Sequence, residues 1–191
     1  LPHVLELMAF RTSAHLSHLR TQKTVEQLGA AASCRVGRED VLFQVDVLRE
    51  YVPVVLPLML ANVLCPSVLP DEVGEACAHV VELQQMMEDK PDSLVVELLH
   101  VAAYQGTLGH NLYATEKDLP MCTPENIKEF ISQECTPDRL TVVGVNVDFQ
   151  ELCKWTARSF AEQGQALHRP GERAAEPAVY TGGEIRMARP N

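Results

Sequence analysis

The first residues of the chain combine a histidine and a carboxylate at a spacing that suits metal chemistry. His3 and Glu6 lie three residues apart in the segment LPHVLELMAF, so both would project from one face of a helix. A catalytic zinc needs three protein ligands and an open position for water. The position one turn after His3, where a second imidazole would stand, holds Leu7, which has no lone pair to donate. The segment therefore offers one imidazole and one carboxylate.

The hydrophobic pattern predicts a mixture of helices and strands that would position this segment. Helices are expected over 3–10, 21–28, 49–64, 70–88, 93–104, 124–133 and from a cap at Asp148 to about 162. Strands are expected over 31–38 and 41–47, joined as a hairpin through 37–40, then over 140–147 and from 180 to 187. The run 140–147 is almost continuously apolar, which is typical of a strand buried on both faces.

These elements predict an α+β fold in which helices pack on a mostly antiparallel sheet. Residues 1–191 are interpreted as one domain, in which 163–177 form a flexible loop and 178–191 begin a terminal strand or linker. The longest apolar stretch, 51–63, contains Pro53 and Pro57 and is too short for a membrane span, so a buried helix is expected. A cleavable targeting segment is not expected within the sequence, which opens directly in the first expected helix.

Composition restricts the function without assigning it. The formal net charge of −10 argues against nucleic-acid binding, which requires a basic face. It is compatible with a surface for cationic ligands, but an acidic excess more often means only solubility. The six cysteines, at 34, 65, 77, 122, 135 and 153, form no C-x-x-C pair and are expected to pack as small apolar residues. This usage suits a reducing compartment such as the cytosol or the mitochondrial matrix.

Several motifs occur in the order found in one peptidase family. The segment HVLELMAFRTS at 3–13 resembles the metal-binding helix of the inverted-zincin (pitrilysin-like, M16) peptidases, and VEQLGA at 25–30 resembles the helix end that follows it. Further similarities are Cys65-Pro66 with the acidic residues at 72–75, ELLHVAAYQGTLG at 97–109, and YTGG at 180–183. The resemblance covers nearly the whole chain and points in particular to the mitochondrial processing peptidase and the core proteins of the cytochrome bc1 complex.

The resemblance implies a degenerate site. The third zinc ligand of active members is a glutamate that falls here on Leu83, with Glu82 beside it. His3 and Glu6 would then be remnants, with ligands lost at Leu7 and Leu83, so no catalytic residue, metal or cofactor is expected. Glu82 would return as a ligand only if the alignment shifted by one residue. His79, one turn before Leu83, could in principle join His3 in a weak site.

The resemblance also implies a role for such a chain. It predicts a non-catalytic alpha-type subunit of the mitochondrial processing peptidase, which acts as a core subunit of respiratory complex III and supports presequence processing by a catalytic beta partner. Expected partners are a second half-domain of the same family, that beta subunit, the other bc1 subunits and cationic presequence peptides. The membrane link would be indirect, on the matrix side of the inner membrane. The fold is expected to lack its first strands, which precede the motif helix in the family. The alternative is an active zinc metallopeptidase with a rearranged site.

Overall fold

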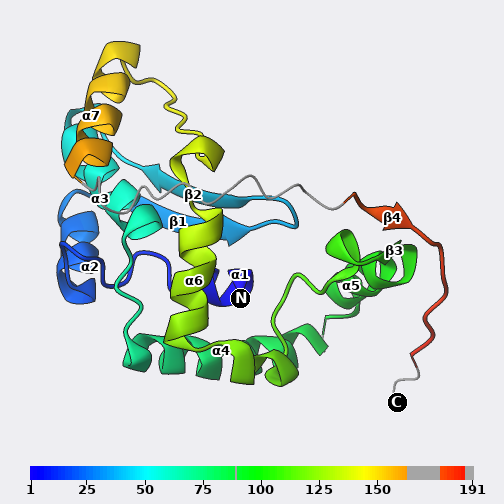
Figure 1. Cartoon of the computed structure of the whole chain (residues 1–191). Helices are drawn as coiled ribbons and strands as arrows, with labels where there is room; N and C mark the ends of the chain where they lie inside the picture. The colour runs from blue at the N-terminus through cyan, green and yellow to red at the C-terminus, as the bar shows by residue number, and fades with distance from the viewer. Residues whose placement is uncertain (89, 163–176, 188–191) are drawn as a thin grey trace.

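Helix α1 (Pro2–Leu7) is short and lies between a β-hairpin and two longer helices, as Figure 1 shows. The computed structural model describes residues 1–88, 90–162 and 177–187. Helix α1 packs with α4 (Pro70–Glu88) and α6 (Pro124–Glu134) around one apolar core. The buried members of this core come from the three helices and the segments beside them: Val4, Leu5, Met8, Val68, Val73, Ala76, Val80, Cys122, Ile127 and Ile131.

The predicted hairpin is confirmed. Strands β1 (Ala31–Val36) and β2 (Val41–Asp46) pair in antiparallel fashion with Cys34 opposite Phe43. The turn is closed by the N–H of Gly37, which donates to the carbonyl of Asp40 at 2.8 Å. A Cβ at Gly37 would lie 2.2 Å from the Asp40 carboxylate, so a larger residue here would push that side chain aside. The hairpin covers α1 from the side opposite α4 (Figure 1).

A second group of helices lies at the far end of the hairpin (Figure 1). It consists of α2 (His18–Gln27), α3 (Val52–Leu64) after the 3-10 turn η1 (Arg49–Tyr51), and α7 (Phe149–Glu162). The predicted buried helix over the apolar stretch is confirmed, because most side chains of α3 from Val55 to Leu64 are buried. The cap at Asp148 is confirmed as well, since its carboxylate accepts from the N–H groups of Gln150 and Glu151. Within the described residues, no helix combines the length and apolarity needed to cross a membrane.

Helix α5 (Pro91–Ala103) leads into a small outlying unit. Strands β3 (Tyr104–Gln105) and β4 (Val179–Tyr180) form a second antiparallel pair beside it. Between β3 and β4 the chain also forms three 3-10 turns, η2 (Thr107–Gly109), η3 (Glu116–Met121) and η4 (Pro137–Arg139). The α+β class is therefore confirmed, with antiparallel pairing in both described sheets.

Two strand predictions are wrong: one strand is absent and the other is much shorter than expected. Residues 140–147 form no strand, and Val143 and Val145 are 77% and 88% exposed. An apolar, β-branched segment becomes a strand only where a neighbouring strand supplies hydrogen bonds, and no described strand pairs with this one. In the segment 180–187 only Tyr180 belongs to a strand. The predicted loop lies almost wholly outside the described residues, since 163–176 are not among them.

Candidate functional site

His3 is buried in the interior, with 4% of its surface exposed. The backbone N–H of Ala114 donates to its Nδ1 at 3.1 Å, and the ring of Tyr113 meets the imidazole edge to face at a centroid distance of 5.2 Å. Burial lowers the pKa of His3 below its usual value. Because Nδ1 accepts a hydrogen bond, the single proton of the neutral ring is on Nε2. The lone pair of the imidazole is therefore already in use.

Glu6 and Leu7 have different surroundings on the same helix. The Glu6 carboxylate accepts from the N–H of Val36 at 3.2 Å, which ties α1 to the end of β1. Glu6 also borders a shallow groove formed by α1, α2 and β1, together with His18, Glu26 and Ser33. Leu7 is half-buried and packs against the core. The helix thus presents a carboxylate to the groove and an apolar side chain to the core.

The residues of α4 that the sequence singled out lie close to α1 but do not assemble with it. Leu83 is half-buried, whereas Glu82 is exposed. The Nδ1 atom of His79 lies 3.1 Å from the Glu82 carboxylate, and His79 is near enough to His3 to act on it electrostatically. Throughout 1–88, 90–162 and 177–187, three or more His, Cys, Asp or Glu side chains nowhere gather in an arrangement that could hold a metal ion.

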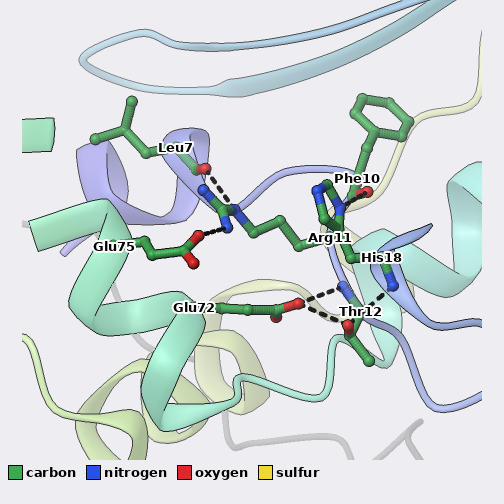
Figure 2. A network of polar contacts seen from close by, with 7 residues as sticks. All are labelled: Leu7, Phe10, Arg11, Thr12, His18, Glu72 and Glu75. Carbon is green, nitrogen blue, oxygen red and sulfur yellow. Dashed lines mark hydrogen bonds and ion pairs between the residues drawn. The ribbon is translucent and has the colours of Figure 1, made fainter. Parts of the chain in front are cut away.

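The segment after the motif helix is fastened to α4 by a polar network, shown in Figure 2. Arg11 donates to the backbone carbonyl of Leu7 at 3.4 Å and to the carboxylate of Glu75 at 2.5 Å. The guanidinium therefore caps the C-terminal end of α1, where carbonyl groups lack helical partners, and links it to α4. Phe10 takes a left-handed backbone conformation, with φ of +58°, so α1 cannot extend to residue 10 as predicted.

A second part of the same network involves Thr12 and Glu72 (Figure 2). The N–H and hydroxyl of Thr12 both donate to one carboxylate oxygen of Glu72, at 3.3 and 2.6 Å. The hydroxyl of Thr12 in turn accepts from the backbone N–H of His18 at 3.0 Å. Glu72 is only 9% exposed. This carboxylate therefore orders the connection between α1 and α2.

The most heavily bonded charged pair was not identified from the sequence. Arg38 and Glu97 form an ion pair of 2.7 Å whose side chains are 14% and 10% exposed. The guanidinium also donates to the carbonyls of Leu108 and His110, and Glu97 accepts from the N–H of Leu112. The pair joins the hairpin turn to α5 and to the segment that leads to Ala114. Arg38 stands in a polar turn, where no local pattern predicts a partner 59 positions away.

Residues from two other segments that resemble the family, 97–109 and 180–183, have structural roles. The Nδ1 of His100 donates to the carbonyl of Val96 at 2.8 Å, and the ring stacks on Tyr104. Gly182 has a φ of +65°, and a Cβ on Gly183 would come within 2.5 Å of the carbonyl oxygen of Ala102. The glycine pair is therefore needed for the close approach of β4 to the end of α5.

Comparison with known proteins identifies the family to which the chain is similar. The family model "Insulinase (Peptidase family M16)" matches residues 1–116. The chain is 30% identical over 187 residues to "Probable mitochondrial-processing peptidase subunit alpha-2, chloroplastic/mitochondrial" of Arabidopsis thaliana, covering 97% of this chain and 36% of that protein. It is 28% identical to "Mitochondrial-processing peptidase subunit alpha" of Solanum tuberosum, covering 96% and 36%. It is 27% identical to "Cytochrome b-c1 complex subunit 2, mitochondrial" of Homo sapiens, covering 96% and 40%.

The chain thus spans well under half the length of each of these mitochondrial relatives. The family model, by contrast, covers more than half of the chain and includes the helix that carries His3, Glu6 and Leu7. The chain belongs to the Insulinase family, Peptidase family M16.

Proposed function

We propose that the chain forms part of a non-catalytic, alpha-type subunit related to the mitochondrial processing peptidase, serving as a structural core subunit of the cytochrome bc1 complex. In this role it supports presequence processing by a catalytic beta partner. The observation that carries the proposal is the motif helix itself. The sequence around this helix, residues 3–13, resembles the family motif, but Leu7 stands at the second ligand position. The relatives of the chain carry the names of alpha subunits and of bc1 subunit 2.

The donor atoms at this face support the loss of catalysis, because they do not fit a three-ligand zinc site. Leu7 and Leu83 have no donor atoms. The Nδ1 lone pair of His3 accepts from Ala114, and coordination through Nε2 would require moving the proton to Nδ1, against that backbone donor. Without a zinc-bound water, Glu6 has nothing to deprotonate.

The rearranged-site alternative would require a different ligand set. His79 and Glu82 are the nearest candidates on α4, but both are exposed and the His79 Nδ1 lies within hydrogen-bonding distance of Glu82. The proposal therefore treats this pair as a surface contact. Glu75, the next carboxylate along α4, is bound to Arg11.

The proposed assembly follows from the family relationship. The partners are a beta-type subunit that keeps the full H-x-x-E-H motif, a second half-domain of the same family and the remaining bc1 subunits. Residues 1–191 constitute one half-domain in this proposal, and 178–191 lead toward the next unit. Attachment to the matrix side of the inner membrane would be peripheral, through partners. The acidic net charge of −10 is compatible with contact to cationic presequences.

The proposal is tested by metal content. The protein purified in its native assembly is dialysed, and the subunits are then separated for metal analysis. This subunit is expected to hold less than about one tenth of a zinc ion, against about one for the catalytic partner, which is the internal control. Near one tightly held zinc in this subunit would contradict the proposal.

Repair of the motif provides the matched variants. Leu7→His restores the neighbouring helix ligand but leaves Leu83, so no chelator-sensitive hydrolysis is expected. Leu7→His combined with Leu83→Glu is expected to gain weak zinc binding. Chelator-sensitive hydrolysis by the single variant would mean that Glu82 or another residue already serves as third ligand.

The assembly is tested separately by mild detergent extraction of mitochondria and native separation. Migration with complex III supports the core-subunit role. Migration only with a soluble peptidase would restrict the function to processing, and a free monomer would contradict both roles.

A further inference from the structure

Two connections between the helix groups run side by side. The first leads from α1 to α2, and the second leads from α3 to α4. Two backbone hydrogen bonds of 2.9 Å join them, from Ala14 to Cys65 and from Ser67 to Thr12. An antiparallel bridge lies between these bonds. Residues 10–18 and 65–68 therefore form a clasp, through which the chain passes twice between the two groups.

Both segments of the clasp contain a residue in a strained backbone conformation. Phe10 has a φ of +58° and Val68 has a φ of +49°. This left-handed region is costly for a bulky or β-branched residue. Because the paired backbones are antiparallel, both residues lie at the same end of the clasp, the end that adjoins α1 and α4. Rotation at these two residues would therefore move the clasp, and α2 with it, relative to α1.

The helices that adjoin the clasp also contain unpaired polar atoms. One carboxylate oxygen of Glu72 and the hydroxyl of Thr21 are buried without a hydrogen-bond partner among the described residues. Such atoms cost free energy, as strained dihedral angles do, and both persist only where other contacts hold them. The contact that holds the clasp is the other oxygen of Glu72, which accepts two bonds from Thr12.

The clasp also forms a wall of the groove between α1, α2 and β1. Phe10 and His18 line this groove together with Cys34 of β1. The backbone N–H of His18 donates to the hydroxyl of Thr12, which in turn donates to Glu72 (Figure 2). The position of this wall relative to β1 therefore depends on the bonds between Thr12 and Glu72.

We propose that the clasp is a strained two-state element, held closed by Glu72, that keeps the groove between α1, α2 and β1 narrow. When the bonds from Thr12 to Glu72 break, Phe10 and Val68 leave the left-handed region and α2 moves away from β1. The groove then widens while the core around α1 stays folded. A molecule that fits only the wider groove would favour the open state by its difference in affinity for the two states. This inference does not depend on the proposed function.

The first test is amide hydrogen exchange of the whole protein, measured by mass spectrometry. In Glu72→Ala, the amides of residues 12–18 should exchange about tenfold faster or more, because the bonds to a carboxylate are lost, while the amides of α6 should keep their rates. Glu75→Ala is the matched control, since it removes an exposed carboxylate from the same helix, and should change exchange in 12–18 by less than about twofold. Equal acceleration in α6 and in 12–18, or no acceleration in 12–18, would overturn the proposal.

Strain at Phe10 is tested by two variants that both remove the ring. Phe10→Gly accepts the φ of +58°, whereas Phe10→Ala keeps the Cβ that makes this conformation costly. Residues 12–18 should exchange about fivefold more slowly in Phe10→Gly than in Phe10→Ala, although glycine loosens an ordinary position. Equal or faster exchange in the glycine variant would show that no strain is stored, and the two-state element would be rejected.

Cys34 reports the width of the groove. It is a half-buried free thiol that lines the groove, and burial raises its pKa to about 12, so iodoacetamide should modify it slowly in the unchanged protein. In Glu72→Ala its rate of modification, measured by peptide mass spectrometry, should rise about tenfold, whereas the exposed Cys153 should keep its rate. An unchanged rate at Cys34, despite faster exchange in 12–18, would show that the clasp does not set the width of the groove and would overturn the proposal.

Discussion

The motif helix and the Arg38–Glu97 pair differ in how many bonds they make to distant parts of the chain. His3 and Glu6 carry the recognisable chemistry, yet each accepts one backbone hydrogen bond from a distant segment. Arg38 and Glu97 belong to no functional motif, but they bind each other and also bind three backbone groups of the segment 108–112. The difference shows that the residues with recognisable chemistry need not be those that make the most bonds, because here an ion pair outside any motif joins the hairpin turn to α5.

Burial explains the contrast in strength. The Arg38 and Glu97 side chains are 14% and 10% exposed, so either charge would be left without solvent if its partner were removed. His3 is also buried, but its imidazole is neutral, so the loss of its hydrogen bond with Ala114 leaves no unpaired charge in the interior. Glu6 is partly exposed and can turn to water. The three sites should therefore respond to substitution in that order.

The largest effect is expected for Glu97→Leu. It leaves the Arg38 guanidinium buried without its carboxylate, and it also leaves the N–H of Leu112 without its acceptor. The free energy of unfolding should fall by about 3–5 kcal/mol, measured by denaturant titration. Glu184→Leu is the matched control, because it breaks an ion pair with Arg186 whose side chains are 68% and 85% exposed, and it should change stability by less than about 0.5 kcal/mol. If both variants lost the same free energy of unfolding, the Arg38–Glu97 pair would contribute no more to stability than an exposed ion pair.

A smaller loss is expected for His3→Phe. Phenylalanine is larger than histidine and keeps an aromatic ring beside Tyr113, but it cannot accept from the N–H of Ala114. Stability should fall by about 1–2 kcal/mol. His15→Phe changes an exposed histidine and serves as the control, with little change expected. A neutral result for His3→Phe would show that the hydrogen bond to Ala114 contributes nothing net.

The pH dependence should separate His3 from the other histidines. Burial holds the pKa of folded His3 below the usual value of 6.5, so the unfolded chain takes up the proton first as the pH falls. Stability is therefore fully present above about pH 6.5 and declines as the pH drops toward the folded pKa. The unchanged protein should lose more stability than His3→Phe between pH 7 and pH 5, measured by thermal unfolding at fixed ionic strength. Parallel curves would contradict the assignment.

The sequence predicted the elements whose signals are local. Helix α4 was expected over 70–88 and occupies those residues, because an acidic first turn and an apolar period of 3.6 are both readable from neighbouring positions. Asp148 is predicted as a cap for the same reason. The hairpin 31–47 followed from two alternating runs around a glycine turn. These features depend on residues that are close to each other in the sequence.

The sequence could not predict features that depend on distant partners. The segment 140–147 has the composition of a buried strand, but strand formation requires a neighbour that composition does not supply. At the candidate site, the sequence located His3 and Leu7, but not the acceptor role of His3, which comes from a backbone N–H 111 positions away. Arg38 and Glu97 were missed because their long-range pairing leaves no periodic signal.

The smallest effect is expected for Glu6→Gln. This variant tests whether Glu6 acts as a base or only accepts a hydrogen bond. Glutamine keeps a side-chain oxygen that can accept from the N–H of Val36, so stability should change by less than about 0.5 kcal/mol, whereas Glu6→Ala should cost about 1 kcal/mol. In the assembly proposed above, with its catalytic beta partner, the rate of presequence cleavage should be the same as for the unchanged protein. The same Glu→Gln substitution in the H-x-x-E-H motif of the catalytic partner is the control, and should lower that rate by a factor of about 100 or more. If Glu6→Gln lowered the cleavage rate to a similar extent while stability held, Glu6 would be acting as a base, and the motif helix would be a working site instead of a packed remnant.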